Sequence, residues 1–385
     1  MADPASEAAG WLAKLPASQL QAAQAHTDFR LLAWVGGLAL LLGACAFVSH
    51  SGLIGDLRRR LEAAKPRPWA AGAAAAGLLA LILAGLKAAY DAVAGWWGDA
   101  ILSQGGGVPP GPGLAGRLSL AVGGVLPVTV AAVVLVPLML WLMRARPRTW
   151  PLIGGAVLIA AVLAVEWAPY AVSPPATTAT LPAGPLRDGL MALVAETHLP
   201  AHDIYLSLEP DGTDVTGGFG QARLTVGLDL MGASPAAARA YVGHLMGHYA
   251  HNDIFFVCLV GGLTLVAGLF AVQRWAAPLA RRIGARGVLS PAEPEALPAA
   301  AMIAILAATA AALVAGAYLR WANVRADDYS LAHAREPDGL AAVLEREWDH
   351  AAVDPPLIEE VIFYTHPPLK GRLFHAMQWK ATHGG

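Results

Sequence analysis

The sequence predicts a mainly α-helical membrane protein, with about six membrane-spanning helices and a small α+β domain outside the membrane. Three observations lead to this fold class. Hydrophobic residues make up 56% of the chain, charged residues only 14%, and the mean hydropathy is +0.50, whereas soluble proteins carry about 25% charged residues. Six apolar runs are long enough to cross a membrane. Two polar segments, one between these runs and one after them, carry helix and strand patterns of their own.

The apolar runs divide the chain. A hydrocarbon core about 30 Å thick requires about 20 apolar residues in a helix, and the runs that meet this length are 31–49, 69–94, 118–143, 152–172, 254–277 and 298–320. Residues before the first run are mixed in polarity and mildly helical, so we expect them at the membrane surface or mobile. The expected organisation is a surface segment (1–30), four membrane helices (31–172), an α+β subdomain (173–253), two membrane helices (254–320) and a C-terminal helical part of that domain (321–385).

The basic residues in the short connections predict the orientation in the membrane. Connections after the first, third and fifth runs carry twelve Lys and Arg residues, whereas the N-terminal segment and the second connection carry three. The side richer in Lys and Arg is the cytoplasmic one in most membrane proteins. We therefore expect a multi-pass protein of a bacterial inner membrane, with the α+β domain in the periplasm.

Composition excludes some classes of function. The formal net charge is -2, and no basic patch is interleaved with aromatic residues, so the sequence does not predict a nucleic-acid partner. Cys45 and Cys258 both lie in apolar runs and predict no disulfide framework.

The first polar segment predicts a compact fold. Apolar residues recur at helical spacing between 182 and 200, and two strand-like runs follow at 203–209 and 222–228, joined by a Gly-rich connection at 212–220. We expect these two strands to form a hairpin. A helix then begins after Ser234, which is a favoured N-cap residue followed by proline.

His244 and His248 share one face of this helix, because residues four apart lie one turn apart. Two imidazoles at this spacing bind zinc in the motif His-Glu-x-x-His. Here Leu245 takes the place of the glutamate, and its apolar side chain cannot accept a proton from a metal-bound water. Two histidines at this spacing also occur as ordinary helix residues, so the surroundings must decide between a site and simple packing.

Several short motifs follow one another in a fixed order along the chain. They are Gly95-Trp96-Trp97, Gly184-Pro185-Leu186-Arg187, the Gly-Phe-Gly of 218–220, His244-Leu245-Met246-Gly247-His248, Ala326-Asp327, and Thr365-His366-Pro367-Pro368 with Arg372. This series, over roughly residues 50–382, resembles the type I CAAX prenyl proteases and the related heat-shock protease HtpX. The resemblance implies an integral-membrane zinc metallopeptidase with a zincin-like α+β domain.

The resemblance also implies roles for individual residues. His244 and His248 would be zinc ligands, and Asn323 stands where the family has a glutamate as third ligand. Asp327 would support a ligand histidine through a hydrogen bond. His366 and Arg372 match a histidine and an arginine near the family's active site and are further catalytic candidates.

Leu245 and Asn323 replace the two carboxylates on which the family's chemistry depends. A general base contributes about 10²- to 10⁴-fold in rate, so turnover should largely disappear without one. A neutral amide in place of a carboxylate ligand should make zinc binding weak or absent.

Three hypotheses follow from these substitutions. The first is a pseudoprotease that binds a membrane lipid, a peptide or a membrane-protein partner, with the strand 222–228 as an edge for an added strand. The second is an active zinc endopeptidase with a non-standard base and third ligand, and the third is a structural scaffold. The resemblance implies a cytosolic zinc domain, in conflict with the loop charges.

Overall fold

The computed structural model describes residues 3–172, 179–209, 212–218 and 220–384. The expected start of the α+β subdomain at 173 and Phe219 of the Gly-Phe-Gly motif lie outside these residues. The described residues are 75% helical, and the chain divides into two compact units. The first unit contains Met1–Gln24, Ala160–Val260 and Leu313–Gly385, and the second contains Ala25–Ile159 and Gly261–Ala312.

Six helical segments among the described residues are long and apolar enough to cross a membrane, which confirms the predicted number. The protein is therefore an integral, multi-pass membrane protein. The spans are α2 (Ala17–Ser51), α4 (Pro68–Ser103), α5 (Leu114–Ala145), α6 (Trp150–Val162) continued by the π-helix η1 (Leu163–Trp167), α11 (Asp253–Arg282), and the 3₁₀ turn η2 (Pro294–Ala296) continued by α12 (Leu297–His333).

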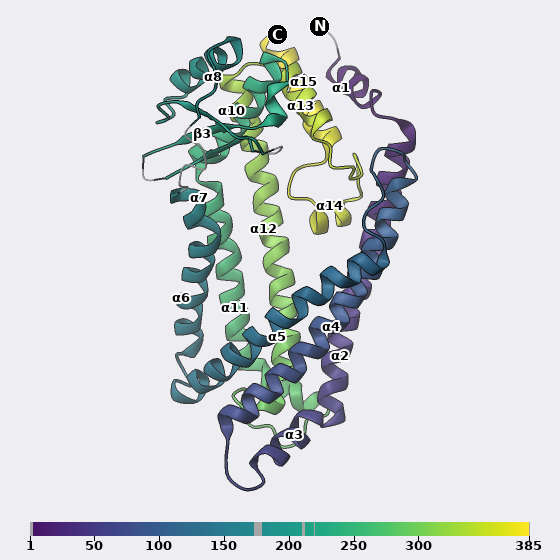
Figure 1. The fold of residues 1–385 in the computed structure, drawn as a ribbon, viewed down its shortest axis with the longest axis vertical. Helices are drawn as coiled ribbons and strands as arrows, with labels where there is room; N and C mark the ends of the chain where they lie inside the picture. The colour runs from purple at the N-terminus through teal and green to yellow at the C-terminus, as the bar shows by residue number, and fades with distance from the viewer. Residues whose placement is uncertain (1–2, 173–178, 210–211, 219, 385) are drawn as a thin grey trace. The chain divides into compact units, whose positions relative to one another are not determined.

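Within the second unit, α4 and α5 lie side by side (Figure 1) because small residues of α4 let the two backbones approach. A Cβ added at Gly77 would meet Val133 Cγ2 at 2.8 Å, and one at Gly72 would meet Leu140 Cδ1 at 3.2 Å. Buried side chains of the short helix α3 (Leu53–Glu62), of α4 and α5, and of the second-unit parts of α11 and α12 form one apolar cluster.

The first unit holds the two long polar segments of the chain, 173–253 and 321–385, as far as the structure describes them. Its elements, besides parts of the spanning helices, are α1 (Pro4–Leu12), α7 (Ala168–Val172), α8 (Pro185–Glu196), β1 (Ile204–Leu206), β2 (Asp214–Thr216), β3 (Arg223–Val226), α9 (Leu228–Met231), α10 (Pro235–His251), α13 (Pro337–Arg346), α14 (Leu357–Phe363) and α15 (Leu369–His383).

The three strands form one small sheet with the order β1-β3-β2, so the expected hairpin is wrong. β1 pairs with β3 in parallel, and β2 pairs with β3 antiparallel. The reason lies in the Gly-rich connection, where Val215 is fully buried between Asp214 and Thr216 and forms a strand of its own. β3 is therefore the central strand, paired on both sides, and the expected free edge at 222–228 does not exist.

Helix α10 begins as expected from the sequence. The Ser234 side chain accepts a hydrogen bond from the backbone N–H of Ala237, and Pro235 opens the helix. One side of α10, including Val242 and Met246, packs into the apolar core that also contains Leu190, Ile204 and side chains of the sheet.

Two glycines let α10 approach α12 closely. A Cβ at Gly247 would lie 2.8 Å from Ala326 Cα, and one at Gly243 would lie 3.2 Å from Ser330 Cα. Because larger residues would push the two helices apart, these glycines bring the α10 histidines beside the polar end of α12.

The N-terminal segment contains helix α1, which packs on α15 in the first unit. Ala8 is 4% exposed and joins an apolar cluster with Leu373 and Met377 of α15. Lys380 donates a hydrogen bond of 3.0 Å to Glu7. The sequence missed this contact because the small, alanine-rich pattern of α1 gives no sign of its partner.

Candidate functional site

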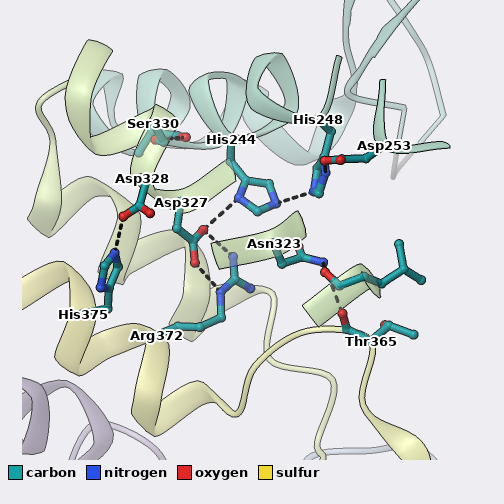
Figure 2. Close-up of polar contacts among 12 residues, drawn as sticks. His244, His248, Asp253, Asn323, Asp327, Asp328, Ser330, Thr365, Arg372 and His375 are labelled. Atoms are coloured by element: carbon teal, nitrogen blue, oxygen red, sulfur yellow. Dashed lines mark hydrogen bonds and ion pairs between the residues drawn. The ribbon is translucent and has the colours of Figure 1, made fainter. Parts of the chain in front are cut away.

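The site lies where α10 ends and turns into α11. Asn252 adopts the left-handed conformation (φ 53°) at the C-terminus of α10, a conformation that asparagine tolerates better than most residues. Asp253 then opens the next helix. This turn directs the Asp253 carboxylate back toward the last turn of α10, where it meets His248 (Figure 2).

His244 and His248 face each other across one helical turn. Their Nε2 atoms are 3.2 Å apart, and the rings meet nearly at right angles, with an interplanar angle of 87°. The Nδ1 atom of each ring lies 2.8 Å from an aspartate oxygen. A carboxylate can only accept a hydrogen bond, so Nδ1 carries the hydrogen in both rings. The two Nε2 atoms therefore face each other and are the ring nitrogens that are not bonded to a carboxylate.

Asp327 holds His244 and is itself held by Arg372. Asp327 is 2% exposed, and Arg372 donates two hydrogen bonds to it, from Nε at 2.8 Å and from Nη2 at 2.7 Å. Such two-point pairing fixes both distance and orientation. Burial lowers the pKa of His244 below its ordinary value of 6.5, although Asp327 opposes the shift, so the ring is neutral at pH 7.

A matching arrangement holds His248. The Asp253 carboxylate, 1% exposed, accepts hydrogen bonds from Tyr318 at 2.9 Å and from Arg325. The Arg325 guanidinium also lies 3.6 Å from the centroid of the Trp321 ring, a favourable cation–π position. Each histidine thus has one aspartate, and each aspartate has one arginine.

Asn323 lies close to this pair, but its side-chain amide is engaged elsewhere. Its Nδ2 donates to the carbonyl oxygens of Leu319 at 2.9 Å and Thr365 at 3.2 Å, as Figure 2 shows. The Oδ1 atom is buried and has no hydrogen-bond partner among the described residues. Asn323 therefore fastens α12 to the loop before α15, and only its oxygen is available to a ligand.

The two remaining candidates form no hydrogen bond to these side chains among the described residues. Leu245 is partly buried and packs against the apolar core of the first unit. Part of His366 is exposed, and its Nδ1 lies 3.2 Å from the Thr365 hydroxyl. Burial of the ring and the nearby charges of Arg372 and His244 lower the pKa of His366 to about 3. The structure therefore brings together the predicted site residues His244, His248, Asp327, Arg372 and Asn323, places His366 within reach of their charges, and shows Leu245 as a packing residue.

Comparisons with known proteins identify the domain that carries this network. Residues 196–380, which include all of these side chains, match the model of peptidase family M48. These residues are a peptidase M48 domain. The resemblance seen in the motifs is thereby confirmed at the level of the family.

Most of the chain has a similar fold among solved structures. The crystal structure of Ste24p from S. mikatae superimposes with a TM-score of 0.55 over 78% of this chain and 76% of that chain, at 16% sequence identity. At this identity the match shows a shared fold. A search of curated proteins finds no match to the chain.

Peptidases of the M48 family use zinc, and the two histidines fit two positions of a zinc site. Nitrogens bound at about 2.0–2.1 Å to one tetrahedral zinc ion are about 3.3 Å apart, close to the observed 3.2 Å. Both Nδ1 atoms are hydrogen-bonded to carboxylates, as in most zinc-binding histidines. The unpartnered Oδ1 of Asn323 is the remaining donor that a metal could use.

The charge of the M48 site fits a zinc ion poorly. Arg372 and Arg325 neutralise Asp327 and Asp253, so neither carboxylate that is bonded to the histidines is left to balance a dication, and unpaired buried charge is costly. No three His, Cys, Asp or Glu side chains within the described parts of the chain could hold a metal ion together. His244, His248 and Asn323 Oδ1 would hold a bound zinc ion weakly, and it would supply a Lewis acid there.

Sequence reasoning missed Asp253, Arg325 and Tyr318. A signal for the last two exists, because Tyr318, Trp321 and Arg325 are spaced at i, i+3 and i+7 and so share one face of α12. The sequence gives no sign of the role of Asp253, because this residue stands at the start of an apolar run. Only the left-handed turn at Asn252 reveals that it points back to the M48 histidines.

Proposed function

We propose that the protein is a membrane-embedded M48 peptidase homologue without proteolytic activity, a pseudoprotease that binds a peptide, lipid or protein partner. The observation that carries this proposal is how Leu245 and Asn323 are placed at the two positions where the family has glutamates. Leu245 packs on the apolar core, and Asn323 donates to two backbone carbonyls. No side chain at either position can accept a proton from water.

The two buried aspartates do not replace the missing base. Asp327 and Asp253 each accept hydrogen bonds from an arginine and a histidine. Moving either carboxylate toward a substrate would leave a largely buried arginine without its partner, which is costly. The alternative, an active zinc endopeptidase, therefore depends on an exposed group such as His366 as base and on the Asn323 oxygen as third ligand.

A cavity beside the sheet supports a binding role for the domain. It has a volume of about 560 Å³ and is lined by residues that include His202, Tyr205 and Arg223. The Arg223 guanidinium lies 3.8 Å from the centroid of the Tyr205 ring. A flat aromatic surface with an adjacent cation suits a ligand that combines apolar and acidic groups.

Metal content and cleavage together test the proposal. We expect protein purified in detergent without chelators to contain far less than one zinc per chain, measured by inductively coupled plasma mass spectrometry. We also expect no chelator-sensitive cleavage of casein or of a prenylated peptide, because water has no base to activate it.

The control is a pair of histidine variants on the same helix. His244→Ala removes a candidate ligand, whereas His251→Ala removes a ring whose Nδ1 lies 2.7 Å from the Gly247 carbonyl oxygen. Stoichiometric zinc with cleavage that is lost in His244→Ala and kept in His251→Ala would overturn the proposal in favour of the active endopeptidase.

The loop charges further lead us to propose a bacterial inner-membrane location with the M48 domain in the periplasm. Because α1 and α15 pack together, reporters fused before α1 and after Gly385 should give the same result. We expect high alkaline phosphatase activity and no fluorescence from green fluorescent protein at either end. Fluorescence at both ends would place the domain in the cytosol, and opposite results at the two ends would contradict the packing of α1.

A further inference from the structure

A cavity in the second unit lies at the end of α2. Its volume is about 390 Å³. Its walls come from the last residues of α2, the first turns of α3, the connection after α11 and the start of α12, and they include Ser49, Arg59, Arg286 and Glu295. All of these residues belong to the second unit.

Two glycines in the left-handed region shape the walls. Gly52 (φ 72°) separates α2 from α3, and Gly284 (φ 106°) brings the connection after α11 against α2. A Cβ at Gly284 would lie 2.7 Å from His50 Nδ1 and 3.0 Å from His50 Cα. The cavity therefore depends on backbone conformations that other residues adopt only with strain, and it is not a loose gap between side chains.

The lining contains one cation without a counter-charge. Arg59 pairs with Asp56, and Glu295 pairs with Arg58 at 3.1 Å. No carboxylate in the described part of the chain forms an ion pair with Arg286. Ser49, which also lines the cavity, is 4% exposed, and its hydroxyl has no hydrogen-bond partner there. The Arg286 guanidinium and the buried Ser49 hydroxyl could therefore both bind an anionic group that is rich in hydrogen-bond acceptors.

We propose that this cavity binds the phosphate group of an anionic lipid headgroup. Phosphate offers oxygens to a guanidinium and to a hydroxyl at the same time. A lipid source is favoured because the cavity lies at the ends of spanning helices, on the side richest in basic residues. Basic pockets between such helices are recurrent sites for anionic headgroups. Soluble phosphate shares this chemistry and is the other source to be tested.

The test uses the full-length protein in detergent micelles and native mass spectrometry. Three probes are compared: phosphatidylglycerol, phosphatidylcholine and inorganic phosphate. We expect phosphatidylglycerol to be retained and to raise the melting temperature, and phosphatidylcholine to do neither. Arg286→Gln should weaken phosphatidylglycerol binding about tenfold or more, because it removes a charge-assisted hydrogen bond. Arg286→Lys should keep much of the binding.

Two matched controls separate the cavity from general surface charge. Arg60→Gln removes the same charge from an exposed residue of α3 that does not line the cavity, and should change binding less than about twofold. Gly55 lines the cavity, and a Cβ there meets no atom closer than 3.5 Å. Gly55→Ala should therefore bind normally, whereas Gly55→Phe should fill the cavity and abolish binding.

The results distinguish a lipid from a soluble phosphate, and two of them would overturn the proposal. If inorganic phosphate raises the melting temperature in an Arg286-dependent way and no lipid is retained, the lipid assignment is wrong and the ligand is a soluble phosphate. Equal loss of binding in Arg60→Gln and Arg286→Gln would show attraction by surface charge alone. Unchanged binding in Gly55→Phe would also overturn the cavity as the site.

Discussion

Replacing Arg372 with alanine is expected to lower the free energy of unfolding by about 3–5 kcal/mol. The side chain makes two hydrogen bonds to Asp327, which is 2% exposed, and removing one partner of a buried ion pair leaves an uncompensated charge. Unfolding in mixed detergent and SDS micelles, followed by tryptophan fluorescence, measures the change. Arg372→Lys should fall between the parent and Arg372→Ala, because it keeps the charge and loses the two-point geometry.

Two further variants test whether the loss of stability in Arg372→Ala comes from the buried ion pair. Arg335→Ala removes an arginine that is 71% exposed and lies 3.6 Å from Glu196, and should cost at most about 1 kcal/mol. The double change Arg372→Leu with Asp327→Leu should cost less than Arg372→Ala, because it leaves no unpaired charge. A loss below about 1 kcal/mol in Arg372→Ala would show that the pair does not hold the site together.

The second large effect is expected when both lost carboxylates are restored. Leu245→Glu alone should add little zinc binding, because the third ligand position remains an amide. Leu245→Glu with Asn323→Glu returns two negative charges to a site whose other charges cancel. We expect zinc affinity to rise by a factor on the order of 100, since even changes to residues around the ligands alter metal affinity about 10- to 100-fold.

Asn323→Glu alone serves as the control, because its effect on the melting temperature should differ with and without zinc. A carboxylate cannot donate to the Leu319 and Thr365 carbonyl oxygens that Asn323 Nδ2 reaches, so without metal the variant should melt below the parent. With zinc present it should recover, because the ion draws the carboxylate away from these oxygens. Isothermal titration and melting with and without a chelator measure both effects. If the double variant binds no metal, His244 and His248 no longer form a ligand pair.

The helices of this protein are predictable where they follow local rules. Apolar length predicts the six spans, and the Ser234-Pro235 pair predicts the start of α10 within one residue. The spacing of His244 and His248 predicts their common face. These features depend on residues a few positions apart.

The features that the sequence did not predict depend on distant contacts. β3 becomes the central strand only because Val215, a single buried residue in a Gly-rich segment, pairs with Leu224. Asp253 reaches His248 only because Asn252 turns the chain. The cancellation of charge at the histidines depends on Arg325 and Arg372, which lie in different helices. Pairings of this kind have no local signature.

The packing of α1 on α15 links the amino terminus to the imidazole of His244. Lys380 and Arg372 both belong to α15. Lys380 contacts Glu7, and Arg372, near the start of the helix, donates hydrogen bonds to Asp327. Asp327 in turn orients His244. A protein that pulls α1 away would loosen the anchor of α15. The position of α1 is therefore connected to the His244 ring through α15, Arg372 and Asp327, although α1 is not part of the site.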